Sequence, residues 1–104
     1  MKRSLIRYKT KPERTDENER LIKAVFAELH AKSPTGVRDL AVKLGDGSFV
    51  HVVATESGES ASAIAGLDAF RAFQSGIRER TSEPPQSNEA TIVGNYRMLD
   101  ESVG

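Results

Sequence analysis

The segment Leu67–Arg97, LDAFRAFQSGIRERTSEPPQSNEATIVGNYR, decides the fold of this 104-residue chain. Apolar side chains recur in its first part every three or four positions, at Leu67, Phe70, Phe73 and Ile77. This spacing predicts one amphipathic helix. Pro84 and Pro85 are expected to end it, because neither has a backbone N–H. The β-branched and aromatic residues of Thr91–Tyr96 then predict a closing strand.

The chain before this segment shows the same two kinds of pattern. It predicts a strand at Ser4–Lys9, a helix from Asp16 that ends before Pro34, and strands at Val37–Leu44 and Ser48–Thr55. The resulting order, βαββαβ, predicts a ferredoxin-like α+β sandwich. Its four-stranded antiparallel sheet carries two helices on one face, and the first and third strands are central. Residues 1–100 are expected to form one domain, and 101–104 a polar tail.

The predicted third strand is apolar on both of its faces. Phe49 and Val53 alternate with Val50, Val52 and Ala54. Two helices cover only one face of such a sheet, and a solvated second face would give clean alternation of apolar and polar residues. A second copy of the chain in a two-fold homodimer is therefore expected to cover the other face. The alternative is that a central strand is simply apolar and that a few exposed valines are ordinary.

Composition excludes several classes of function. The 15 basic and 15 acidic residues cancel, which disfavours a nucleic-acid partner. The absence of cysteine excludes disulfides, thiolate metal sites and a cysteine nucleophile. No apolar run approaches the roughly 20 residues of a membrane span, so a cytoplasmic protein without membrane contact is expected. The two histidines, His30 and His51, lie on different predicted elements, and no metal site is expected.

Several stretches resemble the antibiotic biosynthesis monooxygenase family. They are Arg7–Pro12 before an acidic helix, Leu67–Ile77, Glu83–Pro85 and Val93–Arg97. The resemblance runs along nearly the whole chain, and it implies a homodimeric α+β barrel. The superfamily includes cofactor-free quinone-forming monooxygenases, haem-degrading monooxygenases, small isomerases and many proteins with no known activity, and the branch that this sequence most resembles belongs to the last group. Haem-degrading members pair a helical histidine with an asparagine of the first strand and shape the pocket with a tryptophan. Haem degradation is not expected here, because the chain has no tryptophan and its first strand has no asparagine. No cofactor is therefore expected.

His51 is the strongest candidate for a catalytic residue. It belongs to a central predicted strand, where a base that works near neutral pH could deprotonate a phenol or hydroquinone. The alternative is a histidine that is hydrogen-bonded in the core or an interface. His30, near a helix C-terminus, is interpreted as structural.

The remaining candidates are expected to bind substrate. Tyr8 and Tyr96, on strands expected to be neighbours, would orient a ligand through one hydroxyl in an apolar pocket. Phe70 and Phe73 of the predicted helix would supply apolar lining. Asn95 would polarise a carbonyl or satisfy neighbouring backbone. For each of these residues a purely structural role is the alternative.

Two arginines are expected on the other face of the sheet. Arg7 and Arg97 could bind a carboxylate there, or form ion pairs with acids such as Asp39. Two functions remain open from the sequence. One is a cofactor-independent monooxygenase acting on a small aromatic or quinol. The other is a non-catalytic homodimer that binds a small apolar ligand or serves as a scaffold.

Overall fold

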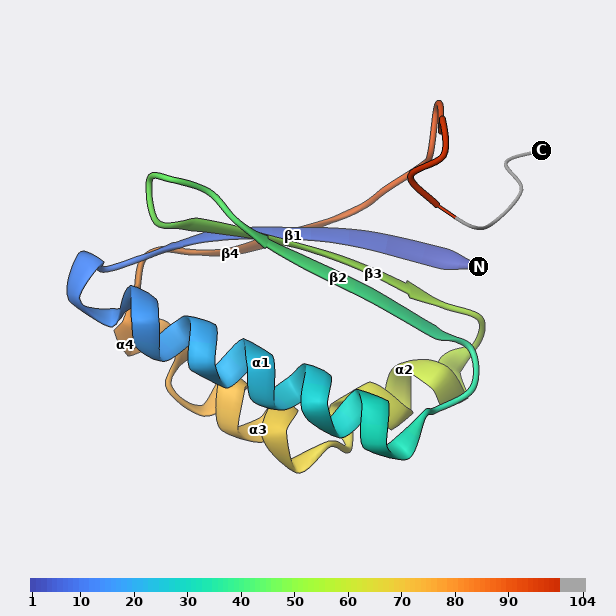
Figure 1. Cartoon of the computed structure of the whole chain (residues 1–104), viewed down its shortest axis with the longest axis horizontal. Coiled ribbons are helices and arrows are strands. Elements are labelled where there is room, and N and C mark those ends of the chain that lie inside the picture. Colours follow the sequence, from blue (N-terminus) through green and yellow to red (C-terminus); the bar gives the residue numbers. More distant parts are fainter. Residues whose placement is uncertain (100–104) are drawn as a thin grey trace.

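The computed structural model describes residues 1–99, so the predicted tail at 101–104 lies outside the described residues (Figure 1). The elements in chain order are β1 (Lys2–Thr10), the 3₁₀ turn η1 (Pro12–Arg14), α1 (Thr15–Lys32), β2 (Val37–Lys43), β3 (Ser48–Thr55), α2 (Gly58–Ala65), α3 (Asp68–Ser75), α4 (Ile77–Arg80) and β4 (Thr81–Glu89). No helix within residues 1–99 is both long and apolar enough to cross a bilayer.

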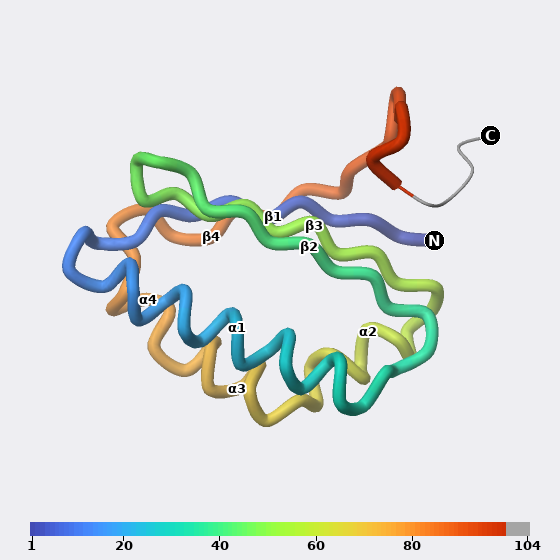
Figure 2. Tube along the Cα trace, in the orientation of Figure 1, coloured from blue at the N-terminus to red at the C-terminus, as the bar shows by residue number. Residues whose placement is uncertain are grey.

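The four strands form one antiparallel sheet in the order β2-β3-β1-β4. All helices lie against one face of this sheet, and α1 runs beside α3 (Figures 1 and 2). This arrangement confirms the predicted ferredoxin-like sandwich, with the first and third strands at its centre. The hairpin between β2 and β3 turns at Gly47, whose φ of 86° suits glycine.

The predicted position of the fourth strand is wrong. β4 begins at Thr81 and contains both prolines, whereas Thr91–Tyr96 forms no strand. β4 is an edge strand, and its pairing with β1 shifts between the pairs Arg7↔Gln86 and Lys9↔Glu83. The prolines occupy this irregular stretch, where the sheet does not need their missing N–H groups. Pro84 and Pro85 therefore bend a strand instead of ending a helix.

The prediction of one continuous helix that ends at Pro84 and Pro85 is also wrong. Gly66 ends α2, and Leu67 is extended, with φ −69° and ψ 134°. A second break at Gly76 separates α3 from the single turn of α4. The interrupted path lets Leu67 insert into the core, where only 3% of it is exposed.

The core lies between the sheet and the helices. Its buried members are Tyr8, Ile22, Val25, Phe49, Leu67 and Phe73. The opposite face of the sheet carries no helix and exposes apolar side chains. Leu5, Leu40 and Val42 are 36%, 51% and 43% exposed on this outer face, beside half-buried Val50 and Val52.

Candidate functional site

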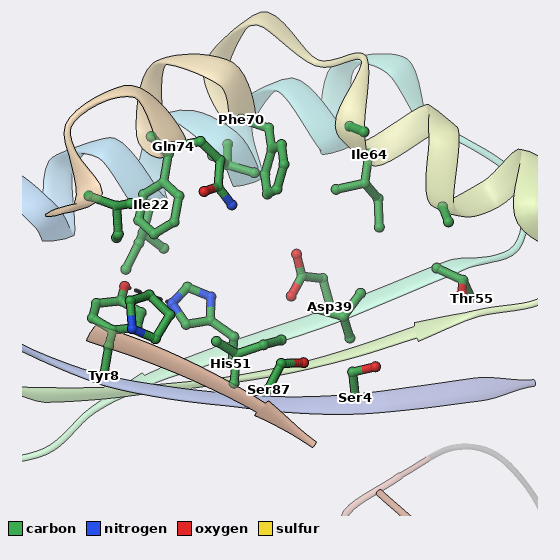
Figure 3. A pocket seen from close by; sticks show the side chains of 18 of the residues that line it. Ser4, Tyr8, Ile22, Asp39, His51, Thr55, Ile64, Phe70, Gln74 and Ser87 are labelled. Atoms are coloured by element: carbon green, nitrogen blue, oxygen red, sulfur yellow. Dashed lines mark hydrogen bonds between the residues drawn. The ribbon is translucent and has the colours of Figure 1, made fainter. Parts of the chain in front are cut away.

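A cavity of about 370 Å³ lies between the sheet and the helices (Figure 3). The strands contribute its polar groups, among them Ser4, Tyr8, Asp39, His51 and Ser87. The helices contribute mainly apolar groups, among them Ile22, Ile64, Phe70 and Phe73, together with Gln74. Such a cavity, mostly apolar with a few convergent polar groups, is typical of a small-ligand site.

Four side chains form a continuous hydrogen-bonded network at one end of this cavity. Buried Arg80 donates from Nε to Asn18 Oδ1 at 3.0 Å and from a terminal nitrogen to the Phe73 carbonyl at 2.6 Å. Asn18, which is fully buried, donates from Nδ2 to the Tyr8 hydroxyl at 2.8 Å. The Tyr8 oxygen lies 2.9 Å from His51 Nε2. The network thus runs from a buried cation to the cavity wall.

These contacts determine where His51 carries its proton. Arg80 fixes the orientation of the Asn18 amide, so Asn18 donates to Tyr8. Burial raises the pKa of Tyr8 to about 12, so its hydroxyl keeps its proton. Within residues 1–99 the one acceptor placed for that proton is His51 Nε2. The neutral imidazole therefore carries its own hydrogen on Nδ1, the nitrogen that is turned towards the cavity (Figure 3).

Burial also sets the charge of His51. It lowers the pKa of the imidazole to about 4, because the charged form loses hydration inside the protein. The ring packs against Tyr8 and Phe73, at centroid distances of 5.4 and 5.8 Å. His51 is therefore a neutral ring at pH 7 that presents an N–H donor to the cavity.

Asp39 is a site residue that the sequence analysis placed wrongly. It was expected on the outer face with Arg7, but it points into the cavity (Figure 3). Its Oδ1 is buried and has no hydrogen-bond partner among the described residues. Burial raises the pKa of the carboxyl group from 3.8 to about 6, against the smaller opposing effect of the Leu40 backbone N–H. Asp39 also lines a second hollow of about 360 Å³, together with Phe26 and His30.

The structure brings four of the six predicted site residues to one cavity and leaves two outside. Tyr8, His51, Phe70 and Phe73 line it. Tyr96 is 80% exposed in a segment that follows β4, where the Arg97 guanidinium lies over its ring. Asn95 accepts hydrogen bonds from the backbone of Met98 and Leu99 in the same segment. Both positions depended on the strand that does not form.

The sequence analysis missed two members of the network. Asn18 lies four residues before Ile22, on the apolar stripe of α1, and Arg80 lies three residues after Ile77. A polar residue at helical spacing on an apolar stripe is the signal that could have found each of them. No group of three His, Asp or Glu side chains in the part of the chain that the structure describes could hold a metal ion.

The fold is a ferredoxin-like α+β domain with a cavity between its sheet and its helices, and comparisons with known proteins agree with this fold. No protein-family model matches the sequence, and no curated protein matches it either. Solved structures do match over most of the chain.

One such structure, from Nitrosomonas europaea, is provisionally assigned as an antibiotic biosynthesis monooxygenase. It has a TM-score of 0.75 and 13% identity, over 90% of this chain and 100% of its own. A structure named antibiotic biosynthesis monooxygenase matches with a TM-score of 0.73 and 12% identity, over 90% of this chain and 100% of its own. A protein from Mycobacterium tuberculosis matches with a TM-score of 0.73 and 14% identity, over 90% of this chain and 96% of its own. At these identities the matches confirm the predicted resemblance at the level of the fold.

Proposed function

We propose that this protein is a cofactor-independent oxygenase that binds a small aromatic phenol or quinol in the cavity. The observation that carries the proposal is the neutral His51 ring, which is held by Tyr8 and turned into a mostly apolar space. Phe70 and Phe73 supply aromatic faces against which a flat ring can pack. The similarity to structures named as monooxygenases supports the same class of reaction.

The reaction is the oxidation of a phenol to a quinone by dioxygen. One oxygen atom of O₂ is added to a ring carbon, and the other leaves as water with the hydrogen from that carbon and the hydroxyl hydrogen. The ring loses four electrons and O₂ gains four, so no further oxidant or reductant is needed. His51 is the catalytic residue that contacts the reacting hydroxyl or its anion.

Oxygen consumption tests this proposal. The wild-type protein is expected to consume O₂ with 1-naphthol or a substituted hydroquinone, and to release the quinone. His51→Ala is expected to lower the rate at least a hundredfold while the protein stays folded, because the group that contacts the reacting oxygen is gone. His30→Ala is the matched control, since His30 lies outside this cavity.

The second candidate is a non-catalytic protein that binds a small apolar ligand. It is favoured by the Tyr8–Asn18–Arg80 network, because these hydrogen bonds satisfy buried polar groups of the core. Such a network stabilises the fold whether or not His51 is catalytic. Binding of 1-naphthol without any O₂ consumption would contradict the oxygenase and support this reading. Native mass spectrometry of freshly purified protein then identifies the ligand by its added mass.

The proposal includes a homodimer in which the second copy covers the outer face of the sheet. Leu5, Leu40 and Val42 form an exposed apolar surface there, of the kind that marks protein contacts. Leu40→Lys is expected to convert a dimer into a monomer in sedimentation equilibrium. Ala72→Lys, on the exposed face of α3, is expected to leave the dimer intact. A monomeric wild-type protein would contradict the dimer.

A further inference from the structure

One carboxylate oxygen of Asp39, a residue that lines the cavity, is buried without a hydrogen-bond partner. Within residues 1–99, Asp39 Oδ1 is the buried side-chain oxygen or nitrogen without a hydrogen-bond partner. A buried carboxylate oxygen without a donor is costly, and native proteins rarely keep one without a reason. An incoming hydrogen-bond donor on a ligand would satisfy it.

Asp39 and His51 are close enough to act on the same small ligand. Asp39 pairs with Val53 and His51 pairs with Ala41, so the two residues are diagonal neighbours on adjacent strands. Diagonal neighbours on one face of a sheet have Cβ atoms about 7 Å apart. Both side chains project from the sheet into the cavity, with the carboxylate beside the imidazole (Figure 3).

The two groups present complementary chemistry. Asp39 offers an acceptor, and His51 Nδ1 offers a donor because Tyr8 occupies Nε2. The hydrogen-bond network thus favours a donor role for His51 over the role of base that its position in the sequence suggests. A proton acceptor beside a hydrogen-bond donor is the arrangement that stabilises a hydroxyl as it becomes an anion.

We propose that Asp39 is the base that removes the proton from a neutral hydroxy-aromatic ligand, and that His51 Nδ1–H stabilises the resulting anion. This inference rests on the proposed function and names its substrate class and its base. The ligand O–H bond breaks and a bond forms between that proton and the Asp39 carboxylate. The electron pair stays on the ligand oxygen, which accepts the hydrogen bond from His51.

The charge of Asp39 also selects against some ligands. An ionised carboxylate in a mostly apolar cavity attracts a neutral O–H donor and repels a ligand that already carries a negative charge. Aromatic carboxylates are therefore poor ligands, and phenols without acidic substituents are good ones.

A pH dependence follows from the groups that face Asp39. Across this cavity they are Lys2 and Tyr8 from β1 and His51 from β3, and across the second hollow His30 from α1. The lining residues contributed by α2, α3 and α4 carry no titratable group. Burial raises the pKa of Asp39 to about 6 and lowers that of His51 to about 4. The charge of Asp39 therefore changes between pH 5 and pH 7.

Anaerobic binding of two probes tests the inference without turnover. The probes are 1-naphthol and its methyl ether, which differ in the hydroxyl hydrogen, and affinities are measured by fluorescence titration. Wild-type protein is expected to bind naphthol at least tenfold more tightly than the ether, as is typical of a hydrogen bond to a charged group. This preference should increase from pH 5 to pH 7, as Asp39 ionises.

Asp39→Asn removes the proton acceptor with little change in shape. It is expected to weaken the preference for naphthol, because a neutral amide oxygen is a weaker acceptor than a carboxylate, to abolish its pH dependence, and to lower the rate of O₂ consumption at least a hundredfold. Asp16→Asn is the matched control, because Asp16 is an exposed aspartate of α1 outside the cavity. It is expected to behave like the wild-type protein.

The outcomes separate this inference from the function on which it rests. If Asp39→Asn keeps the full wild-type preference for naphthol and its pH dependence, or if wild-type protein binds both probes equally, Asp39 is not the acceptor, although the cavity still binds aromatics. If neither probe binds to the wild-type protein, the proposed function and this inference both fail.

Discussion

Two neighbouring parts of the cavity, its His51 end and its Asp39 end, differ in whether their polar groups are satisfied by hydrogen bonds. At one end, Tyr8 and His51 are linked to Asn18 and Arg80 by hydrogen bonds that satisfy each buried side chain. Beside them, at the Asp39 end, Asp39 keeps a buried oxygen without a partner. A satisfied network gives rigidity and a fixed tautomer, whereas an unsatisfied carboxylate costs stability. This difference is the observation on which the proposed ligand contact of Asp39 rests.

The two ends also respond to pH in opposite directions. Burial disfavours the charged form of both groups, so it raises the pKa of Asp39 to about 6 and lowers that of His51 to about 4. Near pH 5 both side chains are therefore uncharged in the folded protein. Between pH 6 and pH 7 Asp39 becomes the charged member of the pair.

The largest expected effect comes from breaking the satisfied end. Asn18→Ala leaves both the Arg80 Nε–H and the Tyr8 oxygen without their partner in a buried place. It is expected to lower the free energy of unfolding by about 3 kcal/mol, because buried groups that lose a hydrogen bond pay their full desolvation cost. Urea denaturation measures this loss.

The matched control for this variant is Asn88→Ala, in the exposed part of β4. Its effect on stability is expected to stay within about 0.5 kcal/mol. A loss below 1 kcal/mol for Asn18→Ala would show that the network does not stabilise the protein.

The second effect has the opposite sign, because it relieves the unsatisfied end. The pKa of Asp39 rises from 3.8 to about 6, so at pH 7 its charge costs the folded state free energy. The full shift corresponds to roughly 3 kcal/mol, and we expect about 2 kcal/mol after allowing for solvent screening at this partly exposed side chain. Asp39→Asn is therefore expected to stabilise the protein by about 2 kcal/mol at pH 7.

Chemical denaturation at pH 7 and pH 4 checks this prediction. The folded state binds an extra proton between the two pKa values, so the cost of Asp39 appears as pH rises through roughly 4 to 6 and is absent below that window. Asp39→Asn should thus match the wild-type stability at the lower pH, and Asp16→Asn should match it at both. An Asp39→Asn protein that is less stable at pH 7 would show that the carboxylate has a partner.

The sequence predicted the parts of the fold that repeat an apolar pattern. The strand Lys2–Thr10 and the helix Thr15–Lys32 have periodic apolar patterns, and Ser48–Thr55 is a nearly continuous apolar run, so these patterns identify them. β4 buries only its first residue and carries two prolines, so it has no such pattern. Thr91–Tyr96 has the composition of a strand but no neighbouring strand to pair with.

The site could be predicted only where the strand register was clear. Tyr8 and His51 lie on central strands with both neighbours in place, and the cavity contains them both. Asp39 could not be placed, because Leu40 and Val42 look like core residues but face the outer side of β2. Neighbouring residues of a strand face opposite sides, so Asp39 faces the cavity because Leu40 faces outward. A one-residue error in assigning the faces of a strand therefore reverses every side chain on it.

The third prediction compares the pH profiles of the two ends. His51 has a folded pKa of about 4, below its ordinary value of 6.5, so its contribution makes the protein more stable as pH rises through that window. Asp39 contributes the opposite slope over nearly the same range. In the wild-type protein the two contributions are expected to cancel in large part between pH 4 and pH 6.

Removing either group should expose the slope of the other. Relative to wild type, Asp39→Asn is expected to gain stability with rising pH, and His51→Gln to lose it, each by about 1 kcal/mol per pH unit. Glutamine can still accept a hydrogen bond from Tyr8, so the network is disturbed as little as possible. Denaturation midpoints at half-unit steps of pH measure both slopes. Two variants with the same slope would contradict the opposed titration of the two ends.

The smallest expected effect tests whether Asp39 is truly unpartnered. Lys2 is the cationic side chain among the residues that line this cavity, and no ion pair joins it to Asp39 in the described part of the chain. Lys2→Ala is therefore expected to change stability by less than about 0.5 kcal/mol and to leave the titration of Asp39 unchanged in NMR spectra. A cation within reach of Asp39 would hold the pKa of that carboxyl group down, so its removal would shift the titration to higher pH. An upward shift in Lys2→Ala would show that the second end is also satisfied, by an ion pair with β1, and the contrast between the two ends would disappear.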